Sequence, residues 1–189
     1  MDMSSLCYNH CMATFTYFAY GSNMLMERLR KRCKTARFLG VAVVHGYTLA
    51  FSKKSKKDGS GKATIVKTNN DDTVLYGVIF EIELDERPCL NRAEGSEYDR
   101  NDGFVVTRVD TNEKLAVTTY VAKQNAIEKN LVPYDWYKLL IVAGAWQGKV
   151  PDFYLARLKA IESIPDPCPE RSARKEALAV VNESGWAEA

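Results

Sequence analysis

A short β-branched and aromatic run that ends at a glycine constrains the fold of this chain most. Residues 14–20 read Thr-Phe-Thr-Tyr-Phe-Ala-Tyr, a composition typical of a buried strand, and Gly21 and Ser22 end that run. The apolar residues that follow recur at helical spacing, which predicts a helix capped by Asn23 and continuing to Arg32. The chain therefore begins its fold as a strand, a glycine turn and a helix.

Further strands are predicted before most of the helices. Runs rich in Val, Phe, Tyr and Leu indicate strands within residues 36–51, 74–82, 104–110 and 115–121. The polar, lysine-rich residues 52–61 between the first two runs read as a flexible excursion, and residues 111–114 read as a hairpin turn.

Helices are predicted mainly in the second half. A short helix begins near Asp85, with Pro88 in its first turn and Leu90 and Ala93 facing inward, and it ends at Glu94 because glycine follows. Two helices at residues 133–146 and 151–161 form a pair closed at Gly148, and a proline-rich link leads to a last amphipathic helix at 170–181.

This order predicts an α+β fold, with a small mixed sheet or partly closed β-barrel flanked by helices, and argues against a doubly wound sheet. A chain of 189 residues suits a single core. We expect a flexible N-terminal tail at residues 1–13, the main domain at 14–163, and a C-terminal extension with a helix at 164–189.

Composition indicates an ordinary globular protein of the cytoplasm. The formal net charge of +2 gives no electrostatic sign of a nucleic-acid partner. No stretch approaches the roughly 20 apolar residues of a membrane span, and the first thirteen residues lack the pattern of a secretory signal. An odd number of scattered cysteines fits a reducing compartment; they are Cys7, Cys11, Cys33, Cys89 and Cys168.

Two local features are candidates for chemistry. The turn at Gly21 and Ser22 exposes backbone N–H groups where a helix begins, and such groups favour a carboxylate or an oxyanion. Glu94 lies at a helix end in an apolar stretch, where partial burial would raise its proton affinity towards that of a general base. Taken alone, the first pattern also fits a plain strand-to-helix turn, and the second also fits a surface glutamate.

A family resemblance favours the chemical interpretation. The run Tyr17-Phe18-Ala19-Tyr20-Gly21-Ser22-Asn23 resembles the signature of γ-glutamylcyclotransferases, and Leu90-Asn91-Arg92-Ala93-Glu94-Gly95 resembles the family's LDxxEG segment around a catalytic glutamate. Later segments within residues 137–154 are also similar, so the resemblance covers roughly residues 17–161. A related branch that degrades glutathione has a leucine where Asn23 stands, so Asn23 fits the γ-glutamylcyclotransferase branch better.

The resemblance implies an enzyme that converts a γ-glutamyl-amino acid into 5-oxoproline and a free amino acid. Glu94 would be the general acid and base, and neither a metal nor an organic cofactor would be required. The small-molecule substrate would lie against Tyr17, Phe18, Ala19, Tyr20, Gly21, Ser22 and Asn23. This chain departs from the family in having Asn91 where aspartate is expected, and either Tyr98 or Phe104 takes the place of a family tyrosine.

Other functions stay open. The same fold also serves a γ-glutamylamine cyclotransferase or an enzyme that removes a γ-glutamyl protecting group in a biosynthetic pathway. A non-catalytic module that binds a small acidic ligand would keep the pocket without turnover. A nucleic-acid-binding module is the least favoured, because the net charge is small. A homodimer is compatible with the sequence.

Several weaker signals are set aside in favour of ordinary structural roles. Cys7, His10 and Cys11 resemble a metal cluster but have no second ligand pair downstream. As nucleophiles, Cys33 and Cys89 would have only His45 as a partner. A solvated loop is the interpretation preferred for the lysine run Lys53, Lys54, Lys56 and Lys57. Core packing is the interpretation preferred for the aromatic residues Trp136, Tyr137 and Trp146.

Overall fold

The computed structural model describes residues 12–187 of the chain. This part forms the strands β1 (Thr14–Ala19), β2 (Arg37–His45), β3 (Tyr47–Lys54), β4 (Gly61–Lys67), β5 (Val74–Glu83), β6 (Tyr98–Arg108) and β7 (Lys114–Ala122). Its α-helices are α1 (Met26–Arg30), α2 (Arg87–Glu94), α3 (Asp135–Gln147), α4 (Asp152–Lys159) and α5 (Ser172–Glu183). Short 3₁₀ helices are η1 (Ser22–Met24), η2 (Leu84–Glu86) and η3 (Gln124–Ala126).

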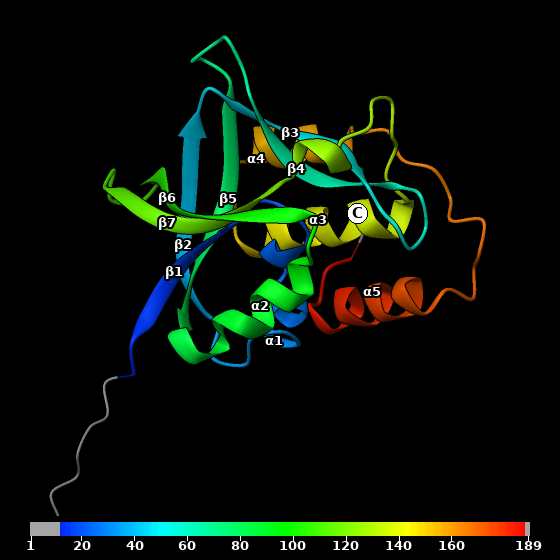
Figure 1. The fold of residues 1–189 in the computed structure, drawn as a ribbon, viewed down its shortest axis with the longest axis horizontal. Helices are drawn as coiled ribbons and strands as arrows, with labels where there is room; N and C mark the ends of the chain where they lie inside the picture. The colour runs from blue at the N-terminus through cyan, green and yellow to red at the C-terminus, as the bar shows by residue number, and fades with distance from the viewer. Residues whose placement is uncertain (1–11, 188–189) are drawn as a thin grey trace, which may run out of the picture.

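A closed barrel with the strand order β1-β5-β2-β6-β7 confirms the predicted α+β fold (Figure 1). Its neighbours run antiparallel except where β1 meets β7, a parallel contact at Tyr17 and Thr118. At this junction the Thr119 hydroxyl donates to the carbonyl of Phe18 at 2.9 Å. The barrel is therefore closed where the sequence predicted a sheet or a partly closed barrel, and Tyr17 lies on the closing strand.

Strands β3 and β4 form a separate two-stranded sheet. The sequence predicted a flexible excursion over residues 52–61, but β3 continues to Lys54 and β4 begins at Gly61. The remaining turn is tied together by Asp58, whose carboxylate accepts from the Ser60 backbone and from the Lys62 amine, both at 3.0 Å. The polar composition thus reflects a hydrogen-bonded turn and not a loose loop.

The sequence predicted one continuous helix from Asn23 to Arg32, and this prediction is wrong. It is divided into η1 and α1 by Leu25, whose backbone is extended (φ −76°, ψ 116°), and the side chain of Asn23 caps neither piece. The break places Leu25 against α3, at a point where a methyl group on Gly144 would lie only 2.4 Å from the Leu25 nitrogen. Close packing on α3 therefore fixes the segment that carries Asn23.

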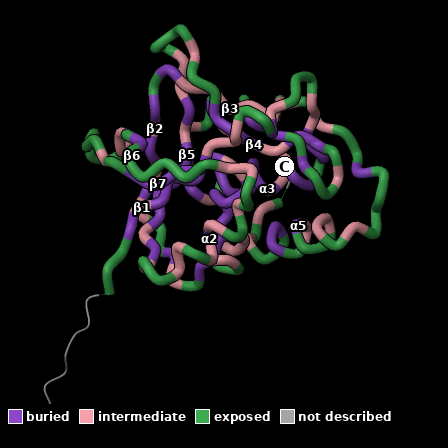
Figure 2. The backbone as a smooth tube through the Cα atoms, in the orientation of Figure 1, coloured by how far each residue is buried: buried purple, intermediate pink, exposed green. Residues whose placement is uncertain are grey.

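Helix α3 is the central element outside the barrel. Most of its residues are buried, as expected for a helix covered on all sides, and Figure 2 shows burial concentrated in the barrel strands and around this helix. Helix α5 packs on it through Ala177, Val180 and Val181, which belong to the same apolar core. The predicted extension is thus joined to the core, and its Asp166 accepts a hydrogen bond from the Trp136 indole at 2.8 Å.

Helix α2 and the start of β6 differ in detail from the prediction. Leu90 is fully buried as expected, whereas Ala93 is exposed. The helix ends at Gly95, whose φ of +84° suits glycine. Strand β6 begins at Tyr98, six residues before the predicted start at Phe104, and an irregularity in its pairing with β7 falls between these two positions.

The sequence also predicted a flexible N-terminal tail and the absence of a membrane span. The predicted N-terminal tail lies almost wholly outside the described residues. Within residues 12–187, no helix combines the length and the hydropathy needed to cross a membrane.

Candidate active site

Glu94 meets the first strand and turn of the chain at one end of the barrel. It is the last residue of α2, while Tyr17 comes from β1 and Asn23 from η1. The Asn23 amide donates to Oε1 of Glu94 at 2.6 Å and to the hydroxyl of Tyr17 at 3.0 Å. The Tyr17 hydroxyl in turn donates to the same Glu94 oxygen at 3.3 Å. Two residues that lie 77 and 71 positions before Glu94 in the sequence therefore hold its carboxylate.

Arg32 stabilises this arrangement by contacting both Asn23 and Glu94. Its guanidinium donates to Oδ1 of Asn23 at 2.6 Å, which orients the amide so that its N–H groups point at Glu94 and Tyr17. The same guanidinium nitrogen lies 3.9 Å from Oε1 of Glu94. The role expected for Asn23 as a helix cap is thus replaced by a role in positioning the carboxylate.

Burial raises the pKa of Glu94 above its ordinary value. Loss of hydration is the largest cause, and it outweighs the opposing influence of Arg32, the hydrogen bond from Tyr17, the charge of Arg28 and the hydrogen bond from Asn23. The side chain keeps 15% of its surface exposed, so solvent or a ligand reaches it. A carboxylate with raised proton affinity and an open side is suited to exchange protons with a bound molecule.

A narrow cavity of about 40 Å³ lies in front of Glu94. Backbone and short side chains form part of its wall, and tyrosines form most of the rest: it is lined by Tyr17, Tyr20, Gly21, Ser22, Asn23, Ala63, Glu94, Tyr98, Tyr120 and Tyr137. Burial raises the pKa of every one of these tyrosines. They are neutral hydroxyl groups at ordinary pH, and Glu94 is the carboxylate among the residues that line this cavity.

The structure brings most of the predicted site residues together and leaves three outside. Tyr17, Tyr20, Gly21, Ser22, Asn23, Glu94 and Tyr98 line the cavity. Phe18, Ala19 and Phe104 do not: Phe18 and Ala19 are buried in the core, and Phe104 stacks on Phe18 with ring centroids 6.2 Å apart. Adjacent residues of a strand point to opposite faces, which explains why Tyr17 and Phe18 separate.

Tyr98, and not Phe104, supplies an aromatic hydroxyl beside Glu94. Its hydroxyl donates to the carbonyl of Ala63 at 2.8 Å. Asn91, which stands where the family has an aspartate, also has a partner: its side-chain oxygen accepts from the Tyr120 hydroxyl at 2.6 Å.

Three cavity residues were not predicted. Tyr137 was assigned to core packing, yet its hydroxyl accepts from the Ala63 backbone at 3.2 Å at the cavity wall. Ala63 lies on the unpredicted strand β4, and Tyr120 lies on a predicted strand without a local sign of function. These three residues reach the cavity because β4, β7 and α3 pack together there. A local sequence pattern does not predict such packing.

Positive charge near the turn comes from side chains more than from a helix dipole. Helix α1 has only five residues, so its dipole is small. Arg28 instead donates to the Ser22 hydroxyl at 3.1 Å. Burial, followed by the neighbouring charge of Arg32, lowers the pKa of Arg28 to about 10, and Arg28 is still charged at neutral pH.

Among the weaker sequence signals, Trp136 is buried as expected for a core residue, whereas Trp146 is 45% exposed. Cys33 is buried, and burial raises the pKa of its thiol to about 12, which is unsuited to a nucleophile. Cys7, His10 and Cys11 lie outside the described residues, and residues 12–187 contain no group of three metal-ligating side chains. Lys53 is not solvated as predicted: it is buried and contacts the Glu97 carboxylate at 2.6 Å.

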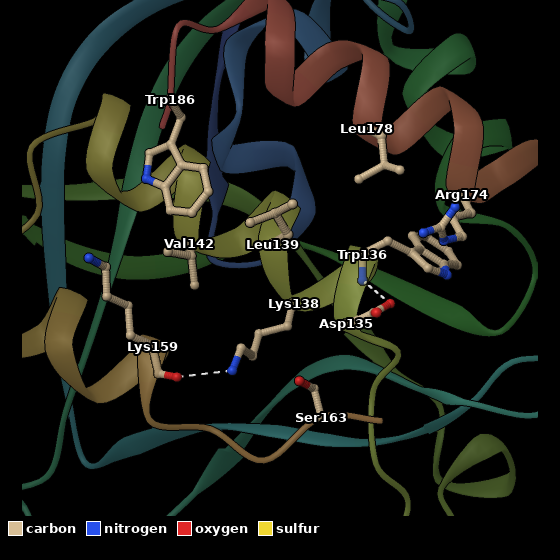
Figure 3. Close-up of a pocket in the computed structure, with 10 residues that line it drawn as sticks. All are labelled: Asp135, Trp136, Lys138, Leu139, Val142, Lys159, Ser163, Arg174, Leu178 and Trp186. Atoms are coloured by element: carbon tan, nitrogen blue, oxygen red, sulfur yellow. Dashed lines mark hydrogen bonds between the residues drawn. The ribbon is translucent and has the colours of Figure 1, made fainter. Parts of the chain in front are cut away.

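A second cavity, of about 350 Å³, lies between α3, α5 and the end of α4 (Figure 3). Its Lys138 amine is used to hold the carbonyls of Lys159 and Ile161, at 2.9 and 2.8 Å. Its one carboxylate, on Asp135, accepts from the Trp136 backbone at 2.6 Å. Both groups thus have structural contacts, and the candidate active site is the one at Glu94, where burial raises the pKa of a carboxylate that lines a cavity.

The closed barrel and the buried Glu94 beside a small cavity together define the candidate site. Residues 17–147 match the family model described as γ-glutamyl cyclotransferase, AIG2-like. The chain belongs to this γ-glutamylcyclotransferase family of enzymes.

Individual relatives agree with the family. The chain is 33% identical over 155 residues to the γ-glutamylcyclotransferase of Mus musculus, which covers 79% of each chain. It is 32% identical to that of Homo sapiens with the same coverage. Among solved structures, one titled γ-glutamyl cyclotransferase superposes with a TM-score of 0.78 at 26% identity, covering 90% of this chain and 99% of the other.

Proposed function

We propose that this chain converts a γ-glutamyl-amino acid into 5-oxoproline and a free amino acid. The observation that carries the proposal is the Glu94 carboxylate, which has a raised pKa and is held by Asn23 and Tyr17 at the wall of a cavity. A γ-glutamyl group contains its own nucleophile, the α-amine. The enzyme therefore has to fold the substrate and move protons.

The first half of the reaction would use Glu94 as a base. Its carboxylate takes a proton from the α-ammonium group, and the freed amine attacks the γ-carbonyl carbon to close a five-membered ring. The backbone at Gly21 and Ser22 borders the cavity, where its N–H groups would bind the substrate carboxylate or the developing oxyanion. The nearby charge of Arg28 favours either anion.

The second half would use the same residue as an acid. Protonated Glu94 gives its proton to the nitrogen of the departing group, and the bond between that nitrogen and the former γ-carbonyl carbon breaks. The ammonium nitrogen loses two protons as it becomes the ring amide, and the departing nitrogen gains two as it leaves as an ammonium. Glu94 therefore carries a proton twice and returns to its ionised state. One carboxylate thus serves both steps.

Neutral tyrosines would position the substrate without competing for its protons. The hydroxyls of Tyr17, Tyr98 and Tyr120 already have partners in Glu94, Ala63 and Asn91. These fixed groups restrict the cavity to a folded γ-glutamyl chain, which is the conformation that brings the amine to the carbonyl.

The test is 5-oxoproline release from γ-glutamyl-amino acids, γ-glutamylamines and glutathione, measured by chromatography with the purified protein. Release from γ-glutamyl-amino acids supports the proposal. Release from γ-glutamylamines alone would favour the γ-glutamylamine cyclotransferase. If no compound yields product while the panel still raises the Tm, the chain is a non-catalytic binding module.

A further inference from the structure

An open groove adjoins the cavity at Glu94. The groove has a volume of about 630 Å³ and is lined by Asn91, Arg92, Gly95, Ser96, Tyr98, Arg100 and Tyr120. Tyr98 and Tyr120 line both spaces, so these two rings stand at the boundary between them. The groove is formed by the last turn of α2, the start of β6 and one residue of β7.

The charged side chains that line the groove are all positive. Its two charged lining residues, Arg92 and Arg100, are both cationic and exposed. Arg100 contacts the Asp102 carboxylate at 3.0 Å, which offsets part of its charge. Arg92 donates to the sulfur of Cys89 at 3.0 Å and forms no ion pair within residues 12–187.

Nearby carboxylates are directed elsewhere. Glu97 contacts Lys53 and Lys56 at 2.6 and 3.1 Å, and Asp99 contacts Lys123 at 3.6 Å. The groove therefore presents a net positive surface to whatever extends from the cavity beyond Tyr98 and Tyr120.

We infer that this groove binds the departing half of the substrate and that Arg92 and Arg100 select departing groups that carry a carboxylate. The inference rests on the proposed function and specifies its substrate class. The glutamyl part faces Glu94 and the turn at Gly21, so the part beyond the scissile bond extends through the boundary into the groove. A departing amino acid brings a carboxylate there, whereas a departing simple amine does not.

The most direct comparison uses two substrates that differ only in that carboxylate, γ-glutamyl-alanine and γ-glutamyl-ethylamine. One charge-assisted contact in a partly exposed site corresponds to about a tenfold difference in kcat/KM. The wild-type protein should therefore prefer γ-glutamyl-alanine by about tenfold. Added salt should narrow this preference, because exposed charges are screened.

The double variant Arg92→Gln, Arg100→Gln tests the residues themselves. It should lower kcat/KM for γ-glutamyl-alanine by about tenfold and leave that for γ-glutamyl-ethylamine within about twofold. The matched control is Arg37→Gln, which removes one exposed cation on β2, paired with Glu81 at 4.0 Å. It should leave both rates unchanged.

The outcomes separate this inference from the proposed function. Equal kcat/KM for the two substrates in the wild-type protein, or an equal loss on both in the double variant, overturns the inference while the cyclotransferase activity stands. Absence of 5-oxoproline from both substrates overturns the proposed function and the inference with it.

Discussion

At the scale of single residues, the protonation of Glu94 is set by a balance between burial and a few neighbours. Loss of hydration raises its pKa, and the charge of Arg32 is the largest influence in the opposite direction. If Glu94 must be ionised to accept the substrate proton, activity falls as pH drops below its pKa. The acidic limb of the pH profile of kcat/KM therefore reports on this balance.

Replacing Arg32 should move that limb. In Arg32→Gln the carboxylate loses a stabilising cation 3.9 Å away, so its pKa rises and the acidic limb shifts to higher pH. The control is Lys31→Gln, which removes the adjacent exposed cation, paired with Glu183 at 3.7 Å. A profile of kcat/KM against pH should move for the first variant and not for the second. A shift to lower pH in Arg32→Gln would contradict this account.

Sequence reasoning identified several of the residues that line the cavity where the signal lay within a short segment. Glu94 beside Gly95, and Tyr17 to Asn23 around the turn, could be identified as candidates because their chemistry and spacing lie within short segments. Tyr120 and Tyr137 could not, since each reaches the cavity through tertiary packing. The contact of Asn23 with Glu94 was also missed. The local sequence around an asparagine is the same whether it caps a helix or orients a carboxylate.

At the scale of elements, α3 determines where the turn lies. Gly144 of α3 contacts η1 so closely that a methyl group there would lie 2.4 Å from the Leu25 nitrogen and 2.6 Å from the Met24 carbonyl carbon. These are backbone atoms, which cannot move without displacing Asn23. Glycine is disfavoured inside a helix, so its presence reflects this contact.

The variant Gly144→Ala should destabilise the protein and impair the site together. Overpacking costs about 1–3 kcal/mol, and a clash with backbone outweighs the gain of about 1 kcal/mol in helix propensity. Chemical denaturation and kcat/KM measure the two effects. Gly103→Ala in β6 is the control, because a methyl group there meets nothing within 4 Å. It should change stability by less than about 0.5 kcal/mol. Equal stability of the two variants would contradict the role given to α3.

Element boundaries were harder to predict than element types. Strand β4 was absent from the sequence-based expectations because its neighbourhood is dominated by lysines and glycines. The start of β6 was missed because residues 99–103 are polar and end in glycine, although Asp99, Arg100 and Asn101 pair with β7. In both places pairing with a partner strand overrides the local composition.

At the scale of the whole molecule, the α+β class followed from the order of strands and helices, whereas closure of the barrel did not. Closure depends on one parallel contact between β1 and β7, which are far apart in the sequence. The predicted C-terminal extension begins at residue 164. Helix α5 shares the core with α3, so the extension contributes to the same folded unit.

The buried carboxylate also makes stability depend on pH. Its pKa is higher in the folded protein than in the unfolded chain, so the favourable contribution of protonated Glu94 is complete below the unfolded pKa of about 4.3. That contribution is lost as pH rises through the folded pKa. Glu94→Gln should therefore have a Tm at neutral pH equal to or above that of the wild type. The gain should disappear in acid, and a lower Tm at neutral pH would contradict this account.

The most direct test of the central claim is 5-oxoproline release by the wild type and by Glu94→Gln, with the affinity for a γ-glutamyl-amino acid measured by calorimetry on the same samples. Glutamine keeps the shape and the acceptor oxygen that Asn23 contacts but cannot take up a proton near neutral pH. We predict a loss in kcat of about 10²- to 10⁴-fold, with the affinity largely retained. A kcat in the variant close to that of the wild type would show that Glu94 is not the acid–base residue.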